Sequence, residues 1–429
     1  MRPPVIACSL LLALLLPSRP GLKGQDFDRW FTGGVLRLDM VFTGSAGQGS
    51  YTLLGLRSEP FFSGSRTTLI DPFDYGDHMM QVRDAETGLL IFSHTYSTLY
   101  REWLTTSESD SVRRAFNHVV RFPMPRSAVR VELYDRDRGG RFHPKWTETV
   151  DPSSIYIDPG NPLKYRSVEL EINGPPAEKV DILFLAEGYT AAEMDKFLED
   201  ARRSAGYIFS EEPFKSRRKD FNIRVVLSVS DESGTDIPGD SIWKSTALHS
   251  TFYTFGIERY MTTMDYISVC NAAANAHYDQ IYILVNTGKY GGGGIYNYYS
   301  ISAADNEDSR AVVIHEFGHS FGGLADEYFS SAVAYNDFFP LDVEPWNPNL
   351  TTMVNFSAKW EDLLEPETPV PTPVEKKFRK TVGVYEGGGY VSTGVFRPMI
   401  DCRMHTNDAA FCPVCVRALE QMIRRQTGK

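Results

Sequence analysis

The chain has 429 residues, of which 42% are hydrophobic and 13% aromatic, and its formal net charge is -11. This length exceeds what a single hydrophobic core usually holds, so we expect two domains or one large decorated domain. The negative charge and the lack of a Lys/Arg-rich block argue against nucleic acid or an anionic membrane surface as the main partner.

Residues 1–24 have the pattern of an export signal. Arg2 supplies a short positive start, an apolar run follows from Val5 to Leu16, and a Pro- and Gly-containing stretch ends near Gly24. The apolar run is too short to span a bilayer, and no later stretch reaches that length. We therefore expect a secreted, periplasmic or cell-surface protein without a transmembrane segment.

Residues 25–173 show the two-residue alternation of half-buried strands, as at Leu36, Leu38 and Met40. Gly, Pro, Asp and Ser separate the apolar runs, as turns between short strands require. The pattern predicts an N-terminal β-sandwich domain that ends near Asn173.

Residues 174–429 follow a different pattern. Longer apolar runs predict buried strands at 182–185, 221–229 and 280–286. Thr190 and Glu193 form a capping box, which predicts the start of a helix between the first two strands. The strand–helix–strand order predicts an α/β domain.

Two unusual segments precede the next predicted helix. The glycine run at 290–294 lacks the Lys-Ser/Thr pair of a phosphate-binding loop, so we interpret it as a flexible lip. The tyrosine-rich stretch at 295–304 predicts an edge strand, to which an extended peptide could add as a further strand.

The stretch HEFGHSFGGLADEY, residues 315–328, carries the clearest chemistry. On a helix, His315 and His319 project from the same face and can reach one ion, with Glu316 beside it. Zinc suits such a pair, requires a third protein ligand, and leaves a fourth position for water. Glu316 would take the proton of that water and pass it to the leaving amine.

The third ligand must come from beyond the helix. Asp326 lies seven residues after His319, which is about 10 Å along a continued helix and too far to share the ion. Gly322 and Gly323 provide a stop, because glycine readily takes the left-handed conformation that reverses the chain. Asp326 is the preferred ligand, and Glu327 is the competing candidate.

The same stretch resembles the active-site signature of the IgA-peptidase family of zinc metallopeptidases, within the metzincin-like group. The resemblance continues in GTDIP (234–238), GVYEGGGY (383–390), CRM (402–404) and FCPVC (411–415). The N-terminal half is similar to the all-β domain that precedes the family's catalytic domain. The resemblance implies a multidomain protein, with a β-sandwich followed by an α/β metzincin-like zinc metallopeptidase domain at 174–429.

The resemblance also assigns roles. His315 and His319 match the zinc-binding histidines, Glu316 the general base and Asp326 the third ligand. In the commoner metzincin pattern the third ligand follows the turn glycine by three residues, which fits Asp326 if Gly323 is that glycine. Zn²⁺ is the only cofactor implied.

Metzincins also place a methionine in a tight turn beneath the metal, before a C-terminal helix. Met404 fits this position, and Met399 is the second candidate. Tyr390 is a candidate donor to a tetrahedral oxyanion, although a solvent-exposed tyrosine is an equally simple interpretation.

Three cysteines lie close together near the C-terminus. We predict a disulfide between Cys402 and either Cys412 or Cys415, which an oxidising compartment permits. A structural metal site is the less favoured alternative, because only three thiols are close in the sequence.

The favoured function is a secreted zinc endopeptidase that hydrolyses peptide bonds of proteins, with immunoglobulin or another host glycoprotein as a candidate substrate. The alternative is a surface β-sandwich protein that binds glycans or proteins and carries a non-catalytic peptidase-like domain. A zinc hydrolase of other amides is a third interpretation.

Overall fold

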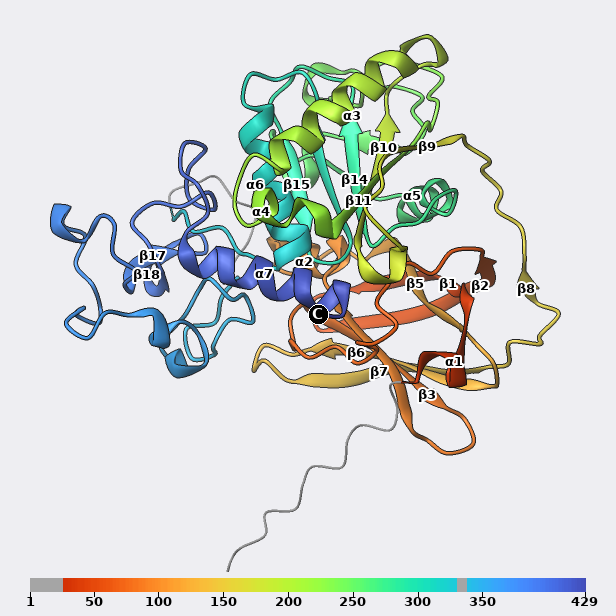
Figure 1. Ribbon diagram of the computed structural model, residues 1–429, viewed down its shortest axis with the longest axis horizontal. Coiled ribbons are helices and arrows are strands. Elements are labelled where there is room, and N and C mark those ends of the chain that lie inside the picture. The colour runs from red at the N-terminus through yellow and green to blue at the C-terminus, as the bar shows by residue number, and fades with distance from the viewer. Residues whose placement is uncertain (1–25, 330–337) are drawn as a thin grey trace, which may run out of the picture.

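The computed structural model describes residues 26–329 and 338–429, so the expected export signal at residues 1–24 lies outside the described residues. The chain forms a β-rich N-terminal domain, drawn in red and orange, and an α/β domain above it (Figure 1). Within the described ranges, no helix is both long and apolar enough to cross a membrane.

The N-terminal domain consists of two four-stranded sheets with the orders β5-β1-β2-β8 and β4-β3-β6-β7. The first contains β1 (Phe31–Ser45), β2 (Gln48–Glu59), β5 (Arg114–Pro125) and β8 (Ile157–Asp158). The second contains β3 (His78–Asp84), β4 (Leu90–Tyr96), β6 (Val129–Arg136) and β7 (Phe142–Val150). Leu38, Met40 and Val131 point into a core shared by both sheets, so the predicted N-terminal β domain is present.

The second domain is built on a six-stranded sheet with the order β15-β16-β14-β10-β11-β9. The four inner strands are parallel, and both edge strands run antiparallel to their neighbours. The strands are β9 (Ser167–Glu171), β10 (Val180–Glu187), β11 (Phe221–Val226), β14 (Gln280–Val285), β15 (Gly292–Ile295) and β16 (Tyr299–Ala303). Every residue of β10, β11 and β14 is buried, as their continuous apolar runs predict.

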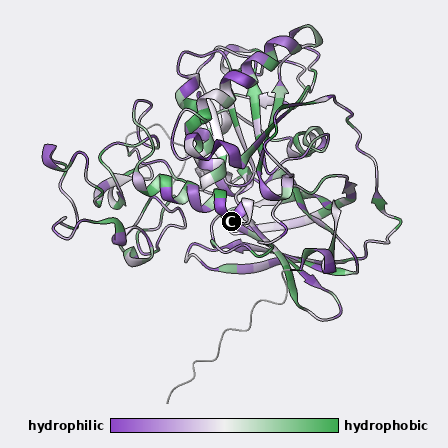
Figure 2. Ribbon diagram, viewed as in Figure 1, coloured by the Kyte–Doolittle hydropathy of each residue, from purple (hydrophilic) through white to green (hydrophobic). Residues whose placement is uncertain are grey.

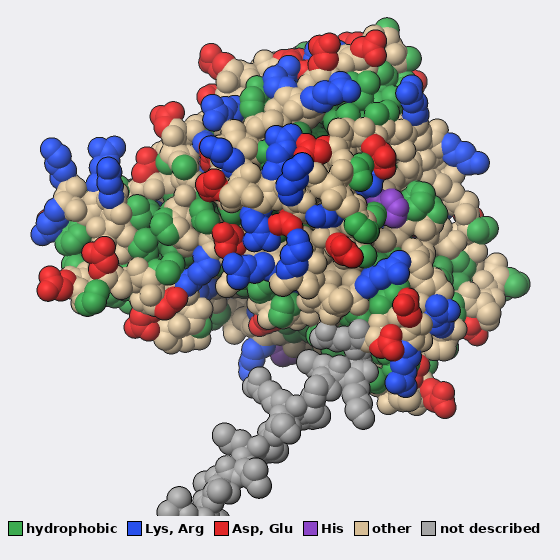
Figure 3. Space-filling view, in the orientation of Figure 1, with side chains coloured by type: hydrophobic (Ala, Val, Ile, Leu, Met, Phe, Trp, Pro, Cys, Tyr) green, Lys and Arg blue, Asp and Glu red, His purple; other side chains and the backbone are tan. Residues whose placement is uncertain are grey.

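Three helices cover one face of this sheet, and the N-terminal domain together with one further helix covers the other. The helices are α3 (Met194–Ile208), α6 (Ser309–Gly322) and α7 (Pro413–Thr427) on one face, and α5 (Tyr266–Ala273) on the other. Beside α5, the N-terminal domain packs on the same face and continues one hydrophobic core into it. Figure 2 shows hydrophobic residues gathered on the central strands, and Figure 3 shows Lys, Arg, Asp and Glu interspersed over the visible surface.

Smaller elements complete the described chain. They are α1 (Phe27–Trp30), α2 (Leu99–Trp103), α4 (Phe214–Arg217), the paired strands β12 (Ser250–Thr251) and β13 (Thr262–Thr263), and the hairpin of β17 (Tyr385–Gly388) and β18 (Val391–Arg397). The predicted capping box is present, because Glu193 accepts a hydrogen bond from the Thr190 amide at 2.8 Å. A short 3₁₀ turn, Ala191–Glu193, separates the cap from α3.

The boundary between the domains differs from the prediction at Asn173. β9 pairs with β11 of the second domain, whereas β8 is the last strand of the N-terminal sheets. The change of domain therefore lies between Asp158 and Ser167. An alternating pattern identifies a strand but not the sheet it joins, because that choice depends on non-local contacts such as Arg224–Glu169 at 3.3 Å.

The glycine run forms the edge strand β15 and not the predicted flexible lip. A Cβ atom on Gly294 would overlap the carbonyl oxygen of Glu316 and lie 2.9 Å from the Cβ of His319. Glycine is needed here because the strand lies directly against α6. The tyrosine-rich stretch supplies β16, which lies between β15 and β14 and is not the edge strand that we predicted.

His118 of β5 lies in an aromatic cluster where the two domains meet. Its ring packs near Phe42 and Tyr96 of the N-terminal domain and near Tyr266 and Tyr298 of the second domain. Neither ring nitrogen has a hydrogen-bond partner. Burial therefore lowers the pKa of His118 well below its usual value, with the charge of a neighbouring histidine acting in the same direction.

We predict that His118→Phe makes folding less sensitive to acid. The native histidine stays neutral, while the unfolded one gains a proton below its pKa near 6.5, so stability falls as the pH drops. Protonation of the unfolded histidine lowers the free energy of unfolding of the wild type by about 2 kcal/mol between pH 8 and pH 5. The variant has no histidine at this position, so it should lack this decrease. Urea denaturation at both pH values measures it, and an unchanged pH dependence would contradict the assignment.

We predict that Gly294→Ala lowers the free energy of unfolding by about 1–3 kcal/mol, because the added methyl group pushes β15 and α6 apart. Gly206→Ala in α3 is the matched control, since nothing lies within 4 Å of its new methyl group. The free energy of unfolding of Gly206→Ala should rise by about 0.5–1 kcal/mol, because alanine has less backbone freedom than glycine to lose on folding. Equal effects in urea denaturation would mean that the close approach at Gly294 is not a packing constraint.

Candidate metal centre

Helix α6 ends at Gly322, and its C-cap is Gly323, the second of the two glycines expected to stop it. Gly323 has φ of 63°, in the left-handed region, and its amide donates to the carbonyl oxygen of His319 at 3.0 Å. A side chain there would be strained and would also approach Trp346. This turn sends the chain back beneath the helix, so Asp326 reaches the two histidines.

Three donor atoms converge at this point. Asp326 Oδ1 lies 3.0 Å from His315 Nε2 and 3.4 Å from His319 Nε2, and the two nitrogens are 3.0 Å apart. Ligands bound to zinc at 2.0–2.1 Å in a tetrahedron are separated by about 3.4 Å. The spacing therefore fits three ligands of one zinc ion, with a fourth position open.

Both imidazole rings are held with one particular nitrogen toward the centre. His315 Nδ1 lies 3.0 Å from the carbonyl oxygen of Arg403, and His319 Nδ1 lies 2.6 Å from that of Leu324. A carbonyl oxygen only accepts, so each Nδ1 carries a proton, and Nε2 is the nitrogen that can bind a metal once any proton on it is displaced. The backbone thereby sets the tautomer that metal binding requires.

The Asp326 carboxylate is arranged as a ligand. Its Oδ1 is buried and faces the two histidine nitrogens, and its Oδ2 accepts from the Tyr390 hydroxyl at 2.6 Å. Burial raises the pKa of Asp326, but His319 outweighs this effect and holds that pKa well below its usual range. Burial likewise lowers the pKa of His319, yet Asp326 raises it to about 9. A divalent cation would replace the proton that this pair holds.

Glu316 lies on α6 next to His315 and lines the same hollow. Burial raises its pKa, against the opposing effect of the two histidines. A carboxylate in such surroundings binds a proton more readily than an exposed one.

Met404 lies beneath α6. A Cβ atom on Gly318 would come within 3.0 Å of its sulfur, and its carbonyl oxygen accepts from the Glu327 amide at 2.7 Å. Met399, the second candidate, is only partly buried at the edge of the same core. Met404 thus packs against the histidine-bearing helix and precedes α7 in the chain.

The two acidic ligand candidates point to different places. Asp326 faces the histidines, whereas Glu327 Oε1 lies 2.9 Å from Asn349 Nδ2 and 3.4 Å from Cys415 Sγ. In this arrangement Glu327 is not the third donor of the histidine site.

The predicted disulfide is absent from the structure. Cys402, Cys412 and Cys415 are buried free thiols, and the sulfurs of Cys402 and Cys415 are 3.7 Å apart, compared with about 2.05 Å in a disulfide. The prediction considered only neighbours in the sequence. In space the three thiols converge on Glu327, which belongs to a segment far upstream.

The histidine site opens into a hollow of about 610 Å³. Its walls include side chains to which the sequence assigned no role: Glu102 of the N-terminal domain, Arg259, Tyr260 and Tyr328. Tyr328 directly follows the acidic pair, which was the one available signal. The others come from segments without a recognisable pattern, so sequence reasoning missed them.

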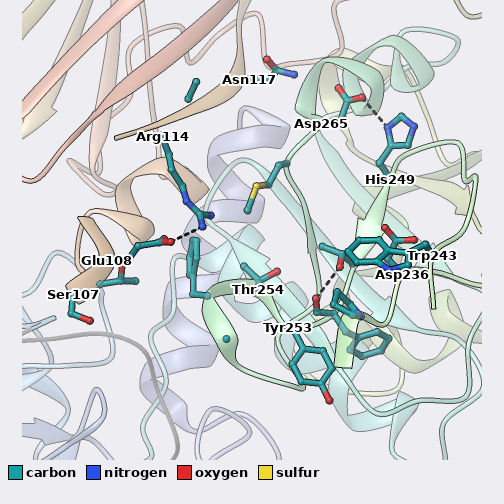
Figure 4. A pocket seen from close by; sticks show the side chains of 18 residues that line it. Ser107, Glu108, Arg114, Asn117, Asp236, Trp243, His249, Tyr253, Thr254 and Asp265 are labelled. Atoms are coloured by element: carbon teal, nitrogen blue, oxygen red, sulfur yellow. Dashed lines mark hydrogen bonds and ion pairs between the residues drawn. The ribbon is translucent and has the colours of Figure 1, made fainter. Parts of the chain in front are cut away.

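A larger hollow of about 1240 Å³ lies at the junction of the two domains (Figure 4). Its ionisable side chains are largely paired with one another, as in Arg114–Glu108 at 2.7 Å and His249–Asp265 at 3.0 Å. Across residues 26–329 and 338–429, the donor clusters able to hold a metal lie elsewhere. Of the two hollows, the smaller one therefore holds the histidine cluster.

Comparison with known families agrees with the division of the chain into an N-terminal β domain and an α/β domain. Residues 168–381 and 374–423 match the family described as IgA Peptidase M64, and residues 26–147 match the Peptidase M64 N-terminus. A search of the curated proteins finds no match. The catalytic-family match begins within β9, where the six-stranded sheet begins. The chain therefore belongs to the M64 family of metallopeptidases and carries that family's N-terminal domain.

Proposed function

We propose that the protein is a zinc-dependent endopeptidase whose metal is held by His315, His319 and Asp326. One observation carries the proposal: two imidazole nitrogens and one buried carboxylate oxygen lie 3.0–3.4 Å apart. Two imidazoles and one carboxylate are a typical ligand set of catalytic zinc. When bound there, zinc polarises the scissile carbonyl and increases the acidity of water.

Glu316 is proposed as the general base and then the general acid. Its carboxylate lines the hollow beside the ligand nitrogens, and burial raises its pKa toward the working pH of a proton carrier. It would accept a proton from the attacking water and deliver that proton to the leaving amine.

The proposed arrangement is metzincin-like. It combines the left-handed turn at Gly323, the third ligand three residues later, and Met404 packed beneath α6. The Met404 carbonyl also fixes the segment after Asp326 through the Glu327 amide. These contacts would hold the metal ligands in place while substrate binds.

The role proposed for Tyr390 has two parts. Donation to an oxyanion stays a prediction, because in the structure the hydroxyl donates to Asp326 at 2.6 Å. We therefore add a positioning role, in which Tyr390 orients the ligand carboxylate. Arg259 lines the same hollow and brings a positive charge that suits a developing oxyanion.

The proposed substrate is an extended polypeptide that pairs with β15. Gly292 of this edge strand already pairs with the segment 259–261, so the part of the edge left for a peptide is at Gly293 and Gly294, which line the hollow beside the histidines. A peptide added along this edge would bring its carbonyl groups to the metal centre. Immunoglobulin or another host glycoprotein is kept as the proposed substrate on the family's description alone, and export on the pattern of residues 1–24.

The alternative, a binding protein with a non-catalytic peptidase-like domain, leaves this arrangement unexplained. A binding function requires neither Glu316 beside the ligand nitrogens nor two rings locked in the ligand tautomer. The N-terminal domain also supplies Glu102 to the wall of the hollow, which favours a shared role in substrate binding.

We predict that Glu316→Gln lowers the cleavage rate by about 10²–10⁴-fold while zinc content stays unchanged, because the amide cannot carry the proton. Asp326→Ala should instead lose the zinc of this site. Metal analysis together with digestion of unfolded proteins and native glycoproteins measures both effects. Cleavage by Glu316→Gln at the wild-type rate would refute the proposed base.

We predict that Tyr390→Phe weakens zinc binding by about 10–100-fold, because the ligand carboxylate loses its orienting hydrogen bond. Tyr385→Phe is the matched control, since that hydroxyl donates only to the carbonyl oxygens of Phe378 and Thr381. Competition with a chelator measures the affinity. A slower turnover with unchanged zinc affinity would instead assign Tyr390 to the oxyanion alone.

A further inference from the structure

A second group of metal-type donors lies outside the histidine site. Glu327, Cys402, Cys412 and Cys415 are all buried, and their donor atoms lie within 4.8 Å of one another. Cys412 is the N-cap of α7 and Cys415 lies in its first turn, while Cys402 precedes the Met404 turn. None of the four takes part in the chemistry proposed for the histidine site.

We propose that these four side chains hold a second, structural zinc ion. The Cys402 and Cys415 sulfurs are 3.7 Å apart, and two thiolates bound to one zinc at 2.3 Å in a tetrahedron are separated by about 3.8 Å. Three sulfurs and one carboxylate oxygen complete a closed tetrahedral site without a place for water. Such closure is typical of structural zinc rather than catalytic zinc.

The carboxylate of Glu327 provides an independent observation. Its Oε2 is buried with no hydrogen-bond partner. Its Oε1 accepts a hydrogen bond from Asn349 Nδ2 at 2.9 Å and lies 3.4 Å from Cys415 Sγ. An ionised carboxylate enclosed among three thiols is costly unless a cation or a donor compensates it. A metal ion at the centre of the cluster supplies that compensation through the unpartnered oxygen.

Backbone amides already point at the sulfurs. The Cys412 amide donates to Cys402 Sγ at 3.3 Å, and the Cys415 amide donates to Cys412 Sγ at 3.5 Å. The N-terminus of the 15-residue helix α7 lies at the same place and favours negative charge. Both features stabilise thiolates, and metal binding would release the thiol protons to solvent.

This ion would fasten the C-terminal region to the loop that carries Asp326. Glu327 is the next residue after Asp326, and its amide donates to the Met404 carbonyl at 2.7 Å. Arg403 lies between Cys402 and Met404, and its backbone carbonyl oxygen accepts a hydrogen bond from His315 Nδ1 at 3.0 Å. A metal at the cysteines would therefore stabilise the orientation of two ligands of the histidine site without touching substrate.

A disulfide explains the cluster less well. A bond between Cys402 and Cys415 would leave the Cys412 thiol and the unpartnered Glu327 oxygen without a role. A metal ion uses all four groups and also protects three thiols from oxidation in the compartment that the export pattern suggests.

The test is metal analysis of the full chain in matched variants. We expect about two zinc ions per chain in the wild type and about one in His319→Ala, which keeps only the cysteine site. Cys412→Ser should also fall to about one, whereas Cys270→Ser, at a buried cysteine outside the cluster, should keep both. In the His319→Ala background, cobalt substitution should give thiolate-to-metal charge-transfer absorption that Cys412→Ser abolishes.

If Cys412→Ser does not fold, Glu327→Gln keeps the thiols and should release cobalt at a chelator concentration at least about 10-fold lower. Metal-free His319→Ala protein, or a Cys402–Cys415 disulfide found by mass spectrometry after alkylation, would overturn the proposal. Cleavage is not part of this readout. An inactive protein that retains the cysteine-bound metal would refute the proposed peptidase function and leave this inference standing.

Discussion

The left-handed turn at Gly323 is the constraint on which the site depends. A continued helix would carry Asp326 away from His319, whereas the reversal places its carboxylate 3.0–3.4 Å from both ligand nitrogens. The same turn sends Glu327 to the opposite side, toward the cysteines. One short segment thus supplies a donor to each of two clusters, and it is fixed by the Met404 carbonyl and by Asn349.

The N-terminal domain packs closely against the α/β domain that carries the histidine site. Its core continues into one face of the six-stranded sheet, and Glu102 of α2 accepts a hydrogen bond from Tyr260 at the wall of the hollow. The opposite face carries α6, against which β15 packs through its glycines. The walls of the hollow at the histidine site therefore come from both domains.

Local patterns predicted much of the site. The spacing of His315 and His319 depends only on helix geometry, so it was readable from the sequence. The need to end that helix indicated Gly322 or Gly323, and only the resemblance to the metzincin pattern favoured Gly323. The fourth donor of the cysteine cluster was not, because Glu327 reaches the thiols through long-range folding. The glycines of β15 were misinterpreted as flexible for a related reason. They allow the strand to lie directly against α6, and this contact between distant segments leaves no pattern in the sequence. The sheet joined by β9 depends on similar distant contacts.

The most direct test of the account is anomalous diffraction from crystals of the purified protein, recorded on both sides of the zinc absorption edge. The account predicts a zinc peak about 2.0–2.2 Å from His315 Nε2, His319 Nε2 and Asp326 Oδ1. Absence of a peak at that position, or a zinc ion held there by Glu327 in place of Asp326, would contradict it.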